Sequence, residues 1–383
     1  MQTLESLQSW CEKNKLPKFR AKQIYQAITK NLISNWNEVL ELPKELQKIL
    51  NKEMPISTLK IKKILPESCR DKACLVPTNA NTVKIAFQTH DDLVIESVLM
   101  RHEGNRNTVC VSTQIGCPVA CKFCATGKMG FTRNLTAEEI VDQVLEFARL
   151  LKYRGQTSGN SRRSDLCAAS VTNVVFMGMG EPFLNYENVI EAIKILNDKD
   201  GFNLGHRHMT ISTSGIVPGI LKFADEQIQV NLAISLHAPN NQIRNSIMPV
   251  NKKYPLEKLL PAVSTYMEKT GRKVFFEYVL LKGVNDSDEN IKELIALLKK
   301  YFTHQMQLVH VNLISFNLIE ETNADQGLCV QSFEPASKER TRKIFDLLQK
   351  NKILSTVRYH FGGEINAACG QLGGLPAKNP HRQ

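Results

Sequence analysis

Apolar segments with strand spacing alternate with segments of helical spacing from about residue 107 onward. The expected strands are Thr108–Thr113, Val171–Met177, His208–Ser212, Val230–Leu236, Lys273–Leu281 and Gln307–Ser315. The clearest expected helices are Thr136–Leu151, Asn188–Leu196, Leu256–Glu268, Ser287–Lys300 and Ser337–Lys350. This order predicts an α/β fold with a parallel sheet, either open or curved into a barrel. In such folds the chemistry lies at the carboxyl ends of the strands.

The first hundred residues have a different pattern. Helical spacing over Arg20–Ile28 and Trp36–Leu50 predicts a small helical domain at residues 1–52, for which a plain packing extension is the alternative. The Leu16-Pro17 and Leu42-Pro43 steps mark turns or helix starts within it. Short β-branched runs then predict a β-rich connector at residues 53–102. Residues 1–63 hold twelve Lys/Arg and six Asp/Glu, so they carry more than half of the chain's net charge of +11. A polyanion such as nucleic acid is the partner that this charge favours, although a basic protein without such a partner has the same balance.

Composition argues against a membrane protein. Hydrophobic residues make up 42% of the chain, and the longest stretch without Asp, Glu, Lys or Arg, Tyr301–Ile319, contains several His, Gln and Asn residues. The N-terminal residues lack the basic and apolar regions of a signal peptide. We therefore expect a cytoplasmic protein without a membrane partner.

Three of the ten cysteines lie within eight residues. Cys117, Cys121 and Cys124 form a C-x3-C-x2-C motif between an expected strand and an expected helix. In a large chain without a secretion signal, such clustering indicates metal or redox chemistry. A structural zinc site takes four ligands, and no Cys/His pair stands at a suitable spacing to complete one. Three thiolates suit a [4Fe–4S] cluster with one iron left open for another ligand.

Further candidate residues follow the expected strands. Gly180 and Glu181 end the second strand in the sequence GMGEP, where glycine permits a close backbone approach to a ligand and the carboxylate can bind an ammonium group. An ordinary glycine turn is the alternative. The other polar strand-end positions are Ser212, Ser235, Leu236, His237 and Asn312. These positions could line one pocket, but each has a plain structural alternative, such as a turn hydroxyl or a satisfied core histidine.

Two more cysteines, Cys369 and Cys110, are candidate functional residues. Cys369 stands among glycines and small residues in GGEINAACGQLGG, which predicts a flexible segment able to bring its thiol into a site. An inert tail cysteine is the alternative. Cys110 lies in the first expected strand of the alternating region, where a small buried residue is the plain interpretation.

Taken in order, the motifs resemble those of one family. They are QIGCPVACKFCATGKMGFTRNLTAEEI, MGMGEP, ISTSG, SLHAP, MPVN, HVNLI and AACGQL, and the N-terminal segment LPKFRAKQIY is also similar. On these motifs the chain resembles the RlmN/Cfr-type RNA adenine methyltransferases of the radical S-adenosylmethionine (radical SAM) superfamily over almost its whole length. One departure is Asn366, where the family usually has an acidic residue.

The resemblance implies a partial (β/α)6 radical SAM barrel at residues 103–360 and a flexible C-terminal segment, residues 361–383, with a catalytic cysteine. It implies that Cys117, Cys121 and Cys124 hold the cluster. It implies that the SAM site is lined by Gly180, Glu181, Ser212, Ser235, Leu236, His237 and Asn312. Cys369 is the implied methyl carrier, Cys110 its partner in a transient disulfide, and Glu96 the proton acceptor.

The implied reaction methylates carbon 2 of an adenine in 23S rRNA, and also in tRNA. It uses the [4Fe–4S] cluster, two SAM molecules per turnover and an electron donor such as flavodoxin or ferredoxin, in an enzyme expected to be a monomer. Methylation of carbon 8 of the same base is the nearest alternative. More remote ones are a radical SAM enzyme with a non-RNA substrate, such as a peptide, and a non-catalytic iron–sulfur protein that binds RNA.

Overall fold

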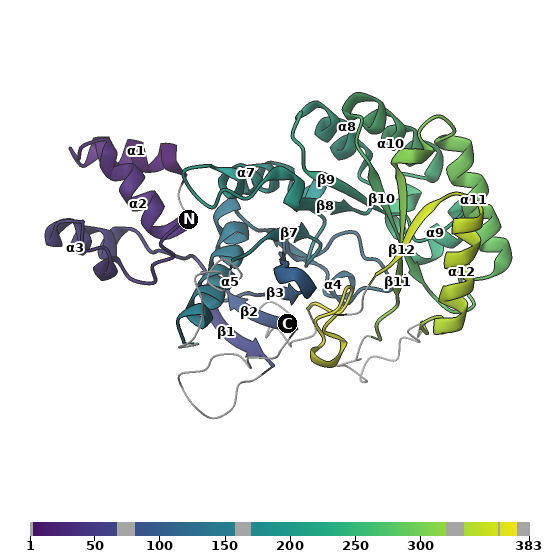
Figure 1. Ribbon diagram of the computed structural model, residues 1–383, viewed down its shortest axis with the longest axis horizontal. Helices are drawn as coiled ribbons and strands as arrows, with labels where there is room; N and C mark the ends of the chain where they lie inside the picture. The colour runs from purple at the N-terminus through teal and green to yellow at the C-terminus, as the bar shows by residue number, and fades with distance from the viewer. Residues whose placement is uncertain (1–2, 67–80, 158–169, 319–332, 359–360, 374–383) are drawn as a thin grey trace. The chain divides into compact units, whose positions relative to one another are not determined.

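The computed structural model describes residues 3–66, 81–157, 170–318, 333–358 and 361–373. The chain divides into two units (Figure 1). The first comprises Met1–Ser112, Leu135–Val175 and Glu187–Met209, and the second comprises Thr113–Asn134, Phe176–Tyr186 and Thr210–Gln383. The division into residues 1–52, 53–102, 103–360 and 361–383 stays a prediction. The expected strand at residues 74–77 and four cysteines (Cys69, Cys74, Cys167 and Cys329) lie outside the described residues.

Short helices begin the first unit, as the sequence predicts. They are α1 (Leu4–Lys13), α2 (Phe19–Thr29), the 3-10 turn η1 (Trp36–Glu38) and α3 (Lys44–Glu53). The helical spacing over Trp36–Leu50 is divided at the Leu42-Pro43 step, which the sequence marks as a turn or a helix start. Asn35 caps only a single turn, Leu40 is 85% exposed, and a new helix begins after Pro43, whose ring suits a helix start but not a helix interior.

The sheet of the first unit follows the order β1-β2-β3-β4-β7. Its strands are β1 (Lys60–Leu65), β2 (Thr82–Gln88), β3 (Val94–Arg101), β4 (Asn107–Cys110) and β7 (Asn173–Phe176). The first four pair antiparallel in sequence order, whereas β4 and β7 are parallel. Two further helices belong to this unit, α5 (Ala137–Thr157) and α7 (Tyr186–Asn197).

Helix α5 begins where the sequence predicts it. The hydroxyl of Thr136 accepts a hydrogen bond from the Glu139 amide, and the Glu139 carboxylate accepts one from the Thr136 amide, which completes the expected capping box. Its apolar face, including Ile140, Val144 and Phe147, is buried. Burial of one face fixes the rotation of the helix about its axis.

The second unit has a sheet whose described strands run parallel in the order β8-β9-β10-β11-β12. These strands are β8 (Met209–Thr213), β9 (Asn231–Ser235), β10 (Val274–Leu280), β11 (Val309–Ser315) and β12 (Leu354–Val357). A separate hairpin pairs β5 (Gln114–Gly116) with β6 (Phe131–Asn134).

Helices connect the parallel strands of this unit. They are α8 (Val217–Asp225), α9 (Asn241–Ile247), α10 (Leu256–Thr270), α11 (Asp288–Tyr301) and α12 (Lys338–Lys350). A further short helix, α4 (Ala125–Lys128), lies between β5 and β6. Helix α8 packs beside α10, and α11 beside α12 (Figure 1). All six strands expected after residue 107 are present, which confirms the α/β class. Strand β12 and helices α8 and α9 were not predicted, because their short segments have no sustained periodicity.

Candidate active site

The three clustered cysteines lie on one loop of the second unit, between β5 and α4. The Cys117 amide donates to the Gly130 carbonyl (2.8 Å), and the Cys124 amide donates to the Cys121 carbonyl (3.2 Å). Burial raises the pKa of Cys117 to about 12 and the pKa of Cys121 well above its usual value, and a negative charge on Cys124 would raise both further. The three thiols are therefore close enough to interact electrostatically.

The thiols do not surround a common point. Within the described ranges, no group of three or more His, Cys, Asp or Glu side chains is arranged closely enough to hold a metal ion. The expected convergence is thus not seen in the side-chain positions. The donor set itself, three thiols on one loop, still suits an iron–sulfur cluster better than a hard cation, because soft thiolate ligands favour iron–sulfur and zinc sites.

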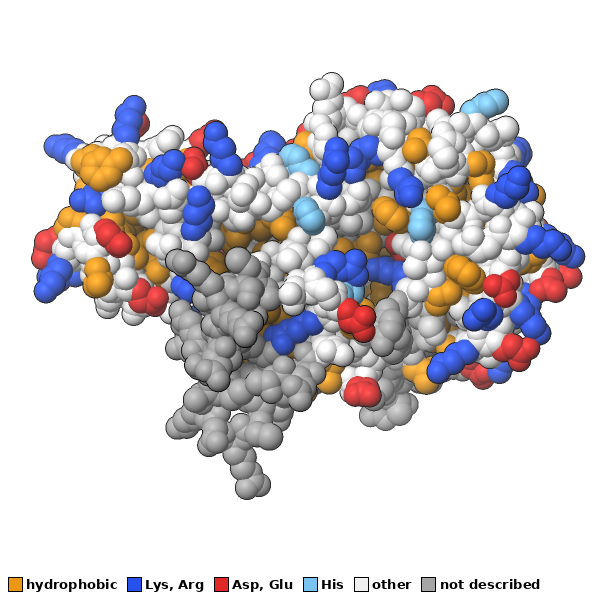
Figure 2. Space-filling view, in the orientation of Figure 1, with side chains coloured by type: hydrophobic (Ala, Val, Ile, Leu, Met, Phe, Trp, Pro, Cys, Tyr) orange, Lys and Arg blue, Asp and Glu red, His pale blue; other side chains and the backbone are white. Residues whose placement is uncertain are grey.

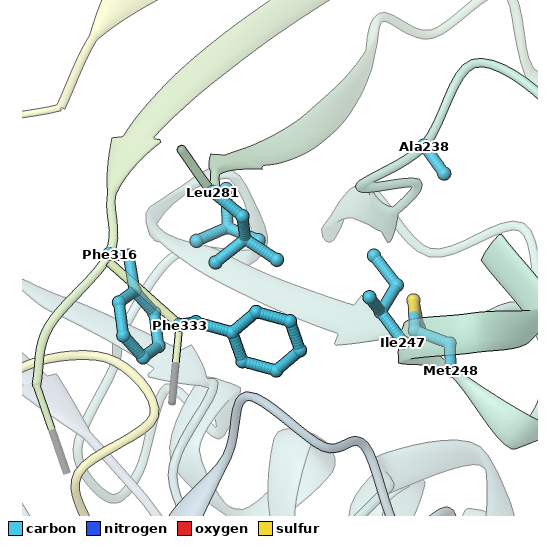
Figure 3. Close-up of a cluster of buried hydrophobic side chains, with 7 residues drawn as sticks. Ala238, Ile247, Met248, Leu281, Phe316 and Phe333 are labelled. Atoms are coloured by element: carbon cyan, nitrogen blue, oxygen red, sulfur yellow. The ribbon is translucent and has the colours of Figure 1, made fainter. Parts of the chain in front are cut away.

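An apolar cluster lies next to this loop. Its buried residues are Ala238, Ile247, Met248, Val279, Leu281, Phe316 and Phe333. Figure 3 shows the rings of Phe316 and Phe333 together, with Leu281 beside them. The ring centroids of Phe316 and Phe333 are 6.1 Å apart, and the two rings meet edge to face. Cys121 and Phe123 pack against the cluster, so close packing restricts the movement of the cysteine loop.

Gly180 and Glu181 lie at the end of a strand, as expected. Gly180 has a φ of +104°, and a Cβ atom there would lie 2.6 Å from the Gln114 Cβ atom, so only glycine fits. The Glu181 carboxylate is 3% exposed and accepts hydrogen bonds from the amides of Phe183 (3.1 Å) and Ser214 (2.6 Å). Burial raises the pKa of Glu181, and these hydrogen bonds oppose the rise. This backbone position and this held carboxylate fit the binding of an amino group.

Three polar residues form a row across adjacent strands. The register pairs Ser235 of β9 with Glu277 of β10, and Glu277 with Asn312 of β11. The Asn312 amide donates to one Glu277 carboxylate oxygen (2.9 Å), and the Arg358 guanidinium lies 3.3 Å from the other. Ser212 lies on β8, one strand further along. The predicted site residues Ser212, Ser235 and Asn312 therefore lie on strands β8, β9 and β11 of the same sheet.

The side chain of His237 makes structural contacts within the second unit. Its ring is buried, its Nδ1 atom accepts a hydrogen bond from the Val279 amide (3.0 Å), and the Phe123 ring meets it edge-on. Burial and the charge of Arg244 lower the pKa of His237 to about 3, so the ring is neutral. The adjacent Leu236 is fully buried. A role for either residue in binding SAM stays a prediction.

Arg244 is a buried cation that sequence reasoning missed. Its guanidinium donates to the carbonyls of Ser214 (2.6 Å), Ser235 (3.0 Å) and Leu236 (3.0 Å), and to the Asn251 side chain (2.9 Å). It thereby ties the loop after β8 to the end of β9. The only sequence signal was its position shortly before MPVN, where a single arginine looks like a surface residue.

Replacing Arg244 by methionine should lower the free energy of unfolding by about 3 kcal/mol, because the acceptors in this buried region lose their donor. Chemical denaturation followed by circular dichroism measures the change. The matched control is Arg342→Met on α12, where the side chain is 80% exposed and the loss should be small. Equal stability of the two variants would contradict the assigned role.

The C-terminal segment is held against the cysteine loop. The Ala125 amide donates to the Gly370 carbonyl (2.7 Å), and the Thr126 hydroxyl donates to the Leu372 carbonyl (2.8 Å). The Asn317 side chain donates to the Cys369 carbonyl (3.0 Å). Cys369 is an exposed residue, but desolvation of its thiol by the surrounding protein raises the pKa of the thiol to about 11. The positive charge of Arg358 acts in the opposite direction and lowers this pKa.

Cys110 and Glu96 belong to the first unit. Cys110 pairs with Val98 in the register of β4 and β3, and Glu96 lies two residues from Val98 on the same strand. The side chains of Cys110 and Glu96 therefore share one face of the sheet. On its own, a single Glu within the strand run LVIESVLM suggests a side chain that faces solvent, but Glu96 is 1% exposed, so that expectation is wrong.

A cavity of about 460 Å³ also lies in the first unit. Residues of α2, α5 and α7 line it together with Gly201–Leu204, and none of the predicted site residues is among them. Of the helices in the described parts of the chain, none combines the length and apolarity needed to cross a membrane.

The fold and these motifs agree with comparisons to known proteins. Residues 163–295 match the family model of the radical SAM superfamily. The structure resembles the crystal structure of a radical SAM methyltransferase from Sphaerobacter thermophilus, with a TM-score of 0.83 and 41% identity over 97% of this chain and 98% of that one. Together they define a radical SAM methyltransferase, a class whose chemistry implies a [4Fe–4S] cluster and SAM.

Curated relatives make the assignment narrower. The chain is 41% identical to the "Probable dual-specificity RNA methyltransferase RlmN" of Clostridium novyi (strain NT), over 97% of this chain and 96% of that protein. It is 39% identical to the protein of the same name in Enterococcus faecalis (strain ATCC 700802 / V583), over 97% of this chain and 94% of that protein. The chain belongs to the RlmN family of RNA methyltransferases, and its substrate is RNA.

Proposed function

We propose that this enzyme methylates carbon 2 of adenine in 23S rRNA and tRNA, with Cys369 carrying the methyl group. The observation that carries the proposal is the docking of Cys369 beside the cysteine loop through the bond between Ala125 and Gly370. A cysteine outside the three-thiol motif, fixed next to that motif, suits a thiol that reacts with what the motif binds. Cys117, Cys121 and Cys124 would hold the cluster, and Gly180, Glu181, Ser212, Ser235, Leu236, His237 and Asn312 would bind SAM.

The chemistry requires a nucleophile on the protein. Carbon 2 of adenine is not nucleophilic and SAM is an electrophile, so direct methyl transfer fails. The Cys369 thiolate can instead take the methyl group from a first SAM molecule. Cys117, Cys121 and Cys124 would hold a cluster that, together with a second SAM molecule, would supply the radical for removal of hydrogen from the S-methyl group of Cys369 and would take back one electron after that carbon has added to the ring.

The remaining steps use side chains of the first unit. Glu96 accepts the proton from carbon 2, which leaves the RNA joined to Cys369 through a methylene group. The Cys110 thiolate then attacks the Cys369 sulfur, so that the S–S bond forms as the C–S bond breaks. The released carbon takes up a proton and becomes the methyl group. Two electrons from a donor such as flavodoxin or ferredoxin reduce the disulfide for the next turnover.

The helical N-terminal domain would bind the RNA backbone. Figure 2 shows Lys and Arg side chains over the surface of α1–α3, and the exposed Lys18 and Lys48 are among the basic residues there. Phosphate contacts give affinity without reading sequence. Selection of the target would then depend on RNA shape and on an adenine outside the base stack.

The product identifies the reaction. The cluster is reconstituted without oxygen, and the protein is incubated with SAM, a reductant, and protein-free rRNA or tRNA that lacks the modification. Mass spectrometry of the digested RNA should show 2-methyladenosine, and the RNA that contains it is the substrate. 8-Methyladenosine would instead place the enzyme with the carbon-8 methyltransferases. Cleavage of SAM to 5′-deoxyadenosine without a methylated adenosine would contradict the proposed substrate.

A further inference from the structure

A buried ion pair joins two strands of the first unit. The Lys84 ammonium of β2 lies 3.1 Å from the Glu96 carboxylate of β3. The two residues are 3% and 1% exposed. Burial of a charged pair is costly, and well-packed apolar residues usually stabilise a fold at least as well. The pair therefore calls for an explanation other than stability.

The pair lies on the sheet face that also carries Cys110. In the register, Val98 of β3 pairs with Lys84 on one side and with Cys110 on the other. Residues that pair directly across strands point to the same face, as does Glu96, two positions from Val98. Lys84, Glu96 and Cys110 therefore share one face.

The other face of β3 packs on helix α5. Ser97, whose side chain points opposite to that of Glu96, donates a hydrogen bond from its hydroxyl to the side-chain oxygen Oε1 of Gln143 on α5. The Ser112 hydroxyl donates to the Glu96 carbonyl (2.6 Å), which holds the backbone at this position. Glu96 is thus fixed at its backbone by Ser112 and at its carboxylate by Lys84.

We propose that Lys84 is a positioning residue for proton transfer in RNA methylation. This inference rests on the proposed function, in which Glu96 accepts the proton from the adenine carbon. In that step the C–H bond breaks, an O–H bond forms on the Glu96 carboxylate, and the electron pair of the C–H bond stays in the ring. The Lys84 ammonium holds the carboxylate in one orientation before the transfer.

A double-mutant cycle tests the inference. The variants are Lys84→Met, Lys84→Arg, Glu96→Gln and the double variant Lys84→Met with Glu96→Gln. Each is loaded with methyl at Cys369, which intact-mass spectrometry measures, and is then mixed with RNA for a single turnover. Lys343→Met, an exposed lysine on α12, is the control for loss of a positive charge.

Glu96→Gln should slow the RNA step about 100-fold, and Lys84→Met about 10-fold or more, whereas methyl loading of Cys369 should stay normal. Lys84→Arg should restore most of the rate, since it keeps a cation beside the carboxylate. In the Glu96→Gln background, Lys84→Met should slow the RNA step by less than about a further twofold. The effects of residues that act through one another on the rate are not additive.

Other results would overturn the inference. A slow Glu96→Gln variant with a normal Lys84→Met variant would leave the proposed function intact but remove the role of Lys84. Fully additive losses, or equal losses in methyl loading and in the RNA step, would mean that the pair only supports the fold. A normal rate in Glu96→Gln would instead contradict the proposed proton acceptor.

Discussion

Replacing Cys369 by alanine should abolish methylation of RNA, with a loss of at least about 1,000-fold. The alanine side chain has no nucleophile to take the methyl group from SAM, and carbon 2 of adenine cannot attack SAM itself. Intact-mass spectrometry should show no methyl group on the purified variant, and labelled SAM should transfer no label to RNA. The iron and sulfide content should equal that of the wild-type enzyme, because Cys369 is not one of the three clustered cysteines.

Cys11→Ala is the matched control for this variant. Cys11 is also a cysteine, but it is fully buried in α1 and has no part in the proposed reaction. Its replacement should cost about 1 kcal/mol of stability and leave methylation unchanged. RNA methylation by Cys369→Ala at the rate of the unmodified enzyme would remove the methyl-carrier mechanism altogether.

Replacing Cys110 by alanine should stop the reaction one step later and trap the RNA on the protein. Methyl loading and radical addition need Cys369 but not Cys110, so the covalent link forms and no thiolate is present to break it. Denaturing gel electrophoresis with labelled RNA should show a band that contains both protein and RNA. The expected yield approaches one RNA per active enzyme, with less than about 1% of normal turnover.

The double variant Cys110→Ala with Cys369→Ala supplies the control, since without Cys369 no adduct can form. Digestion of the trapped species should give a peptide from the C-terminal segment joined to a modified adenosine. Normal turnover by Cys110→Ala would show that the adduct is resolved without this thiol.

The architecture was largely predictable from the sequence. The six strands after residue 107 and the capped helix after Thr136 depend on local patterns, namely apolar runs and a capping box, which single segments of sequence display. The apolar spacing over Trp36–Leu50 continues past Pro43 although the helix does not, and Pro43 itself is the signal in the sequence for the start of a new helix.

The buried charges could not be predicted. Glu277, Arg244 and Lys84 appear in the sequence as ordinary charged residues, and only the strand register shows that Glu277 lies between Ser235 and Asn312. A single Glu inside the apolar strand Lys273–Leu281 was the one available signal. Burial of a charge depends on partners distant in sequence, so a local pattern carries no information about it.

The attachment of the C-terminal segment to the cysteine loop consists largely of main-chain atoms. The carbonyls of Gly370 and Leu372 accept hydrogen bonds from Ala125 and Thr126, and the Cys369 carbonyl accepts one from the Asn317 side chain after β11. The Gln371 side chain adds one bond, to the Leu318 carbonyl (2.8 Å). Substitutions at its less buried positions that leave the backbone conformation unchanged should therefore be tolerated, whereas the buried Ala367, Ala368 and Leu372 are restricted by packing. Asn366 illustrates this tolerance, since it adopts a left-handed conformation (φ +50°) that asparagine accepts more readily than most residues. The position of the Cys369 sulfur thus depends on the backbone path of the segment and on a few buried side chains, more than on the identity of every residue around it.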